Sequence, residues 1–169
     1  ADAKSADLTL ARGVDLPLLG IPMTVKESFD LQGYPTTAGQ KEHLTNIAQR
    51  DAEVVRRAKA AGAVVLGKTN VPVLLHDYQS FNPIYGRTGN PYLLSHSPGG
   101  SSGGSAAAIA MGFSALEIGS DFGGSIRVPS AFCGVYGLKT SFGTESSIGH
   151  AGIDAWSIPS TMQVIGPIA

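Results

Sequence analysis

Glycine-rich segments beside lysine or serine are the parts of this sequence best suited to chemistry. Residues 62–69 (GAVVLGKT) fit the phosphate-loop pattern G-x-x-x-x-G-K-T letter for letter. A phosphate loop lies between a strand and a helix, whereas residues 63–66 are themselves an apolar run typical of a buried strand. The pattern therefore does not predict nucleotide binding. Lys68 is interpreted instead as a strand-end residue that donates hydrogen bonds to nearby loop carbonyls.

A second match, residues 99–103 (GGSSG), fits the G-x-S-x-G turn that presents a nucleophilic serine in many hydrolases. That turn must follow a hydrophobic strand, which the preceding residues 94–98 (LSHSP) cannot form. A Ser-His-Asp triad on Ser101 is therefore not predicted. The histidines of the sequence occur in unrelated contexts and none is needed as a base: His43, His76, His96 and His150.

A third pattern is far longer than the other two. Residues 97–104 (SPGGSSGG) and 119–137 (GSDFGGSIRVPSAFCGVYG) follow two further segments, 20–28 (GIPMTVKES) and 67–72 (GKTNVP). In this order, over roughly residues 16–139, the sequence resembles the amidase signature family. The resemblance implies an α/β fold in which a mixed β-sheet is flanked by helices. It also implies an activity on amides that uses no metal or organic cofactor.

The resemblance implies a Ser-Ser-Lys triad. The matching positions are Ser125 as nucleophile, Ser101 as bridging serine and Lys26 as base, while the neighbouring Ser102 is rejected as the bridge. Family members hold the bridging serine across a cis peptide bond. The implied reaction acylates Ser125, releases ammonia or an amine, and then hydrolyses the acyl-enzyme with water.

The proposed chemistry sets conditions on these residues. A lysine acts as a base only when it is neutral, so the pKa of Lys26 must fall by several units from about 10.4 through desolvation. Met23, Val25 and Phe29 can supply the apolar surroundings. Ser101 can relay the proton because a hydroxyl both donates and accepts hydrogen bonds.

An amide-hydrolysing site also needs donors for the oxyanion of the tetrahedral intermediate. The resemblance assigns this role to four consecutive backbone amides: Phe122, Gly123, Gly124 and Ser125. It also implies that Asp121 and Arg127 pair and brace the turn around the nucleophile. Leu75 and Asp77 are predicted to line the substrate pocket, because they follow the segment 67–72.

The elements that must position these residues follow from apolar periodicity and from glycine and proline punctuation. Residues 51–61 predict an amphipathic helix, and Lys26 is expected at the end of a short strand over residues 23–25. Glycine and proline predict a long functional loop over residues 79–104. Further helices are expected at 3–11, 105–111 and 130–133, and further strands at 63–66, 113–118 and 135–138.

Composition excludes several other classes of protein. Twelve Lys and Arg against 13 Asp and Glu, without a basic run, argue against nucleic acid or anionic lipid as a partner. No apolar stretch approaches the roughly 18 residues that a membrane helix needs. The single cysteine, Cys133, cannot form an intrachain disulfide, is expected to be a buried and inert thiol, and favours a cytoplasmic location.

The 169 residues suit one domain or part of one. Residues 1–169 are expected to be a partial amidase-signature catalytic domain whose N- and C-terminal parts are missing, because the family domain is more than twice this length. The expected partners are a small-molecule amide and the remainder of that domain, with a homodimer left open. Which amide is the substrate is left open as well.

Two other functions remain open alongside an amidase. One is the glutamine-hydrolysing subunit of a tRNA-dependent amidotransferase, which shares the three triad segments but works only with partner subunits. The other is an inactive fragment or binding module.

Overall fold

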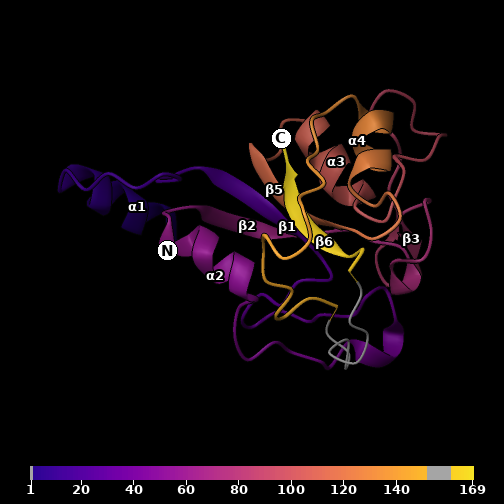
Figure 1. Ribbon diagram of the computed structural model, residues 1–169, viewed down its shortest axis with the longest axis horizontal. Helices are drawn as coiled ribbons and strands as arrows, with labels where there is room; N and C mark the ends of the chain where they lie inside the picture. Colours follow the sequence, from indigo (N-terminus) through magenta and orange to yellow (C-terminus); the bar gives the residue numbers. More distant parts are fainter. Residues whose placement is uncertain (1, 152–160) are drawn as a thin grey trace.

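A four-stranded β-sheet forms the centre of the fold (Figure 1). The computed structural model describes residues 2–151 and 161–169. The strand order is β2-β1-β5-β6, with β1 parallel to both of its neighbours and β6 antiparallel to β5. The strands span β1 Pro22–Lys26, β2 Val64–Thr69, β5 Leu116–Asp121 and β6 Val164–Ile168. The sheet is therefore mixed, as predicted.

Helices flank this sheet, and Figure 1 shows α3 and α4 lying together beside it. The helices are α1 Asp2–Ala11, α2 Glu53–Ala60, α3 Gly103–Ala110 and α4 Arg127–Cys133. Shorter elements are the 3-10 helices η1 Lys41–His43 and η2 Val73–Leu75, and a small hairpin of β3 Phe81–Asn82 and β4 Gly86–Arg87. Within the described ranges, no helix is long and apolar enough to cross a membrane.

The main apolar core lies between α2 and one face of the sheet. Val55 of α2 packs into a cluster with Met23 and Val25 of β1, Phe29 just beyond it and Ile118 of β5. Met23 and Val25 share this face because side chains alternate along a strand. Burying each side chain of this size contributes about 1.5–3 kcal/mol, so the cluster anchors β1 firmly. Lys26 directly follows Val25 on the strand and therefore points to the opposite face, so Met23 and Val25 do not surround its side chain as predicted.

Small residues bring α3 close to the chain that follows β2. The Gly104 N–H donates to the Asn70 carbonyl at 3.2 Å. A Cβ on Gly104 would lie 2.9 Å from Asn70 Cα and closer still to the Asn70 nitrogen and oxygen. The predicted loop 79–104 therefore ends in a helix whose first turn is fixed against the sheet layer.

Most of the predicted elements are present, with ends shifted by a few residues. The predicted strand over residues 135–138 is wrong, because only an isolated bridge joins Gly137 to Ile168. The Leu138 N–H does donate to the Pro167 carbonyl at 3.1 Å. Proline has no N–H to return that bond, so the ladder cannot extend along this edge.

The close packing of α3 predicts different costs for two Gly→Ala substitutions. Gly104→Ala should lower the free energy of unfolding by about 1–3 kcal/mol, because the added methyl overlaps the Asn70 backbone. Gly67→Ala is the matched control, since a Cβ added there would meet nothing within 4 Å and its φ is ordinary, and it should change stability by less than about 1 kcal/mol. Urea unfolding of the full-length protein measures both, and equal midpoints would contradict the packing argument.

Candidate active site

Lys26 ends β1 and is completely buried. Its Nζ lies 2.7 Å from Ser101 Oγ, 2.9 Å from Ser120 Oγ and 3.3 Å from the Ser120 carbonyl oxygen. Burial penalises the charged amine and lowers the pKa of Lys26 to about 7, although nearby Asp121 and Glu117 act in the opposite direction. The amine is therefore poised to lose its proton near neutral pH.

Ser101 approaches Lys26 from the loop that leads into α3. The Gly100–Ser101 peptide bond is cis, and the serine side chain is buried. The predicted contact between Lys26 and Ser101 and the predicted cis bond are both confirmed. Gly100 has no room for a side chain, because a Cβ there would meet the backbone of Asp77 and Tyr78.

Ser125 lies in the turn between β5 and α4, beside the loop that carries Ser101. The Ser102 N–H donates to the Ser125 carbonyl at 3.1 Å, which joins the two segments directly. The Ser125 side chain is half-buried, and its hydroxyl makes no hydrogen bond with any residue that the structure describes.

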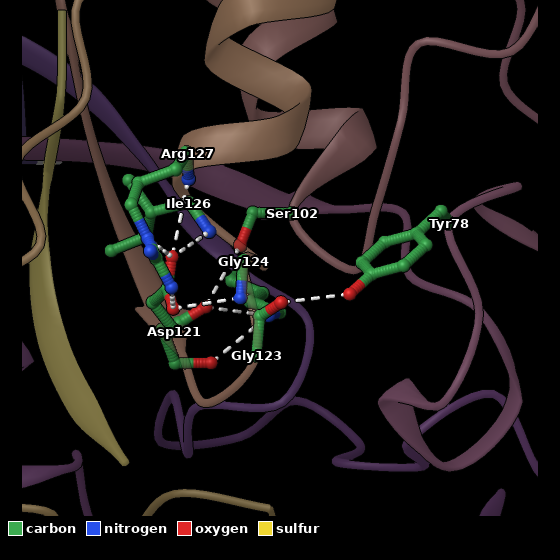
Figure 2. Close-up of polar contacts among 9 residues, drawn as sticks. Tyr78, Ser102, Asp121, Gly123, Gly124, Ile126 and Arg127 are labelled. Carbon is green, nitrogen blue, oxygen red and sulfur yellow. Dashed lines mark hydrogen bonds and ion pairs between the residues drawn. The ribbon is translucent and has the colours of Figure 1, made fainter. Parts of the chain in front are cut away.

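The Asp121 carboxylate at the end of β5 organises this turn (Figure 2). Its oxygens accept the N–H groups of Gly124, Ile126 and Arg127 at 2.9, 3.0 and 3.2 Å. The Arg127 guanidinium donates two further bonds, so the predicted pairing of Asp121 with Arg127 is present. Burial alone would raise the pKa of Asp121, but the bonds from Arg127 and the three amides lower it to about 2.

The turn also fixes the direction of individual backbone amides. The Gly124 N–H points to Asp121, and the carbonyl of the same peptide unit, on Gly123, accepts a hydrogen bond from Tyr78 Oη at 2.7 Å (Figure 2). The resemblance assigned the Gly124 N–H to oxyanion binding. This N–H donates to Asp121 instead and holds the turn. The N–H groups of Phe122, Gly123 and Ser125 donate to no acceptor within the described residues.

The predicted pocket residues lie on the chain that passes this turn. Leu75 is half-buried in η2, and Asp77 is exposed with its Oδ1 accepting the Gln79 N–H at 2.9 Å. Neither side chain is hydrogen-bonded to Lys26, Ser101 or Ser125 in the described part of the chain. Their contact with substrate stays a prediction. The adjacent Tyr78, which does contact the turn, carried no motif that would identify it.

Two residues rejected as catalytic groups have structural roles. Lys68 lies in β2, where its Nζ donates to the Pro35 carbonyl at 2.6 Å and to Thr36 Oγ1 at 3.1 Å, so its predicted bonding to a nearby loop is confirmed. Cys133 is buried, its thiol donates to the Pro98 carbonyl, and burial raises its pKa to about 11. The prediction of a buried thiol is confirmed, and its inertness stays a prediction.

Sequence reasoning missed a buried carboxyl group behind the site. Glu117 of β5 accepts hydrogen bonds from the hydroxyls of Thr24 and Thr69. Burial outweighs these bonds and raises the pKa of Glu117 to about 8, so the group is mostly protonated at neutral pH. A glutamate within the mostly apolar predicted strand 113–118 was the only available signal.

It also missed His150, whose sequence context looked unrelated to the triad. The buried imidazole Nε2 lies 2.9 Å from Ser120 Oγ, and Ser120 contacts Lys26 directly. An isolated bridge between Phe29 and His150 brings the two segments together. The sequence context of His150 gave no sign of this place, because a tertiary contact decides it.

Within the described part of the chain, no cluster of three or more His, Cys, Asp or Glu residues has the arrangement of a metal site. The polar groups at the site are instead hydroxyls, one amine and backbone amides. Such a set suits proton transfer to and from a serine and binding of an oxyanion.

Comparison with known proteins gives consistent matches along the whole chain. The sequence model of the family described as Amidase matches residues 1–169. A putative amidase, AmiB2, from Mycobacterium tuberculosis is 47% identical over 169 residues, which are 100% of this chain and 35% of that protein. A glutamyl-tRNA(Gln) amidotransferase subunit from Roseiflexus castenholzii is 43% identical over 169 residues, covering 100% of this chain and 34% of that protein.

Among solved structures, the native peptide amidase from Stenotrophomonas maltophilia superposes with a TM-score of 0.89 at 36% identity. The match covers 99% of this chain and 34% of that one. The chain thus spans about a third of the length of the relatives it matches. The sheet and its helices have the arrangement found in those structures.

Removing the charge of Asp121 should loosen the turn. At pH 7, Asp121→Asn should lower the free energy of unfolding by about 2 kcal/mol, because three amides and Arg127 lose a charged acceptor. The folded-state pKa of about 2 lies below the ordinary 3.8, so this stabilisation is present above pH 3.8 and lost as pH falls through 2. The difference from wild type should therefore shrink over that range in urea unfolding.

The exposed Asp15 provides the control. Asp15→Asn should leave the unfolding midpoint unchanged. An Asp121→Asn protein as stable as wild type at pH 7 would show that the turn is held by other contacts.

Proposed function

The chain belongs to the amidase family, and on that premise we propose that it hydrolyses the carbon–nitrogen bond of an amide through an acyl-enzyme on Ser125. The observation that carries the proposal is the buried Lys26 amine, 2.7 Å from Ser101 Oγ and with its pKa lowered to about 7. A surface lysine has no reason to be desolvated against a serine. A buried one in this setting can act as a base near neutral pH.

In the proposed first step, neutral Lys26 takes the Ser101 proton while Ser101 takes the Ser125 proton. Ser125 Oγ then attacks the amide carbon, and the carbonyl oxygen becomes an oxyanion. The N–H groups of Phe122, Gly123 and Ser125 are the candidate donors to this oxygen, since they have no acceptor within the described residues. Asp121 and Tyr78 keep the turn in shape through the Gly123–Gly124 peptide unit.

In the second step, the relay runs in reverse. Charged Lys26 returns its proton through Ser101 to the departing nitrogen, the carbon–nitrogen bond breaks, and the acyl group remains on Ser125. Water then attacks the ester by the same relay, releasing the acid and restoring the Ser125 hydroxyl. Asp121 and Arg127 support the turn and take no proton.

A second candidate is hydrolysis of glutamine to supply ammonia to a partner protein. The 43% identity to a glutamyl-tRNA(Gln) amidotransferase subunit favours it, and the proposed chemistry on Ser125 would be the same. Ammonia release from free glutamine that depends on an added partner protein would distinguish it from an independent amidase. A cytoplasmic location, a homodimer and a substrate pocket at Leu75 and Asp77 stay predictions.

The assignment of the nucleophile predicts a selective loss of activity. Ser125→Ala in the full-length protein should reduce amide turnover to less than about a hundredth of wild type and abolish labelling by a fluorophosphonate probe. The fold should survive, because the Ser125 hydroxyl has no partner among the described residues. Ser141→Ala, at an exposed serine, is the control and should be labelled normally. A labelled Ser125→Ala protein would overturn the assignment.

The assignment of the base predicts a particular pH dependence. Lys26 is the working base only when neutral, so kcat/KM should rise with pH through about 7 and level off above it. Lys26→Ala should remove most activity, with partial recovery at high pH, where hydroxide replaces the amine. The pH dependence of kcat/KM measures both effects.

Histidine variants separate this base from an imidazole, which titrates in the same range. His43→Ala and His96→Ala should leave the acid limb in place. If either change abolishes the limb while Lys26→Ala keeps near-normal turnover at neutral pH, the Ser-Ser-Lys assignment is wrong.

A further inference from the structure

His150 is a buried imidazole held between Ser120 and Gln163. Its Nδ1 lies 2.7 Å from Gln163 Nε2, and its Nε2 lies 2.9 Å from Ser120 Oγ and 3.1 Å from Ser28 Oγ. Its ring packs against Phe29 with centroids 4.6 Å apart. Every polar atom of the ring therefore has a partner, although none of them is a substrate group or one of the three proposed triad residues.

These contacts define which nitrogen carries the proton. Burial, reinforced by the nearby Lys26 charge, lowers the pKa of His150 to about 3, so the ring is neutral at working pH. With the Gln163 amide nitrogen facing the ring, His150 Nδ1 is the acceptor of this bond. The ring proton then lies on Nε2, and we assign it to the shorter of the two Nε2 contacts, Ser120 Oγ at 2.9 Å rather than Ser28 Oγ at 3.1 Å.

Ser120 Oγ consequently receives two N–H groups, one from His150 and one from Lys26. These two bonds use both lone pairs of the hydroxyl oxygen, so its own O–H points away from the amine. Neutral Lys26 can then place its two N–H groups on Ser120 Oγ and the Ser120 carbonyl. Its lone pair is left facing Ser101 Oγ, 2.7 Å away.

We propose that His150 is a positioning residue for the lysine base, acting through Ser120 to direct the Lys26 lone pair toward Ser101. The inference rests on the proposed function of Lys26 and Ser101 and adds a group that touches neither substrate nor reacting atoms. Without the His150 N–H, the Ser120 hydroxyl can turn and donate to the neutral amine, in competition with Ser101. The charged amine also gains a stronger acceptor, since Ser120 Oγ no longer shares its lone pairs.

The other ionisable groups near the amine do not replace this contact. Glu117 of β5 bonds to the hydroxyls of Thr24 and Thr69, and Asp121 is occupied by its amides and Arg127. Glu117 is mostly protonated at neutral pH, so Asp121 is the group that acts on Lys26 through its charge. Among the described residues, only Ser101 and Ser120 are hydrogen-bonded to the amine, and His150 contacts Ser120.

The test is His150→Phe in the full-length protein, which fills the ring's space but donates no hydrogen bond. We expect kcat to fall by about tenfold or more with KM within about threefold of wild type. The acid limb of kcat/KM should move up by about half to one pH unit, because losing the His150 bond favours charged Lys26. His150→Gln, whose Nε2 can reach the same oxygen, should restore most of kcat and the original limb.

Ser120→Ala tests the same link by removing a single oxygen. It should lower kcat, and adding His150→Phe to it should cause no further loss, because the two residues act through one contact. His96→Phe, at an exposed histidine, is the control and should behave as wild type. Urea unfolding of each variant separates these effects from a loss of fold.

The outcomes distinguish this inference from the proposed function. If Lys26→Ala is inactive but His150→Phe and Ser120→Ala both keep wild-type kcat and acid limb, the role of His150 is wrong and the base assignment stands. If the losses of kcat caused by His150→Phe and by Ser120→Ala simply add in the double variant, His150 does not act through Ser120. If Lys26→Ala is active, the proposed function itself fails.

Discussion

The burial of one amine at the carboxyl edge of a sheet is the constraint on which the rest of this structure depends. A charged amine removed from water costs several kcal/mol unless it is well paired. Lys26 has hydroxyl and carbonyl partners rather than a direct carboxylate partner, so its neutral form is favoured relative to a lysine in water. The strand, the Ser101 loop and the β5 end must all be placed precisely for those partners to reach it.

The two nearby carboxyl groups take opposite protonation states, and this keeps the amine from being held charged. Glu117 is fully buried, and burial outweighs the hydrogen bonds from nearby hydroxyls and raises its pKa to about 8. The carboxylate of Asp121 accepts hydrogen bonds from Arg127 and three backbone amides, which stabilise its charge, so it stays ionised with a pKa of about 2. The negative charge of Asp121 is thus already paired with Arg127 and hydrogen-bonded to backbone amides of the turn that carries Ser125.

Parallel strand pairing explains why these groups meet at all. β1 runs parallel to β5, with Val25 opposite Ile118, so the ends of both strands lie at the same edge of the sheet. Lys26 and Ser120 follow those paired residues and come into contact there. The small residues at the start of α3 then let the Ser101 loop pack down on this edge.

Local sequence was sufficient for the elements and for the residues that carry a motif. Apolar periodicity located α2 and β2, because a buried helix face and a buried strand leave regular patterns. It failed at residues 135–138, where a strand-like apolar run meets a proline-containing edge that cannot continue the ladder. The family resemblance carried by the glycine-rich segments assigned roles to Ser101 and to the turn at 121–127. Close backbone approach leaves no room for a side chain at Gly100, next to Ser101.

Only the tertiary structure decided the surroundings of these residues. The hydrogen-bond partners of Lys26 come from positions 75 and 94 residues away, and no local pattern records such distances. The same holds for His150, which reaches Ser120 through packing against Phe29. Glu117 and Gly124 show the reason most plainly. The protonation of Glu117 depends on its desolvation, and the direction of the Gly124 N–H depends on which acceptor lies within about 3 Å. Folding alone sets both the desolvation and the neighbouring groups.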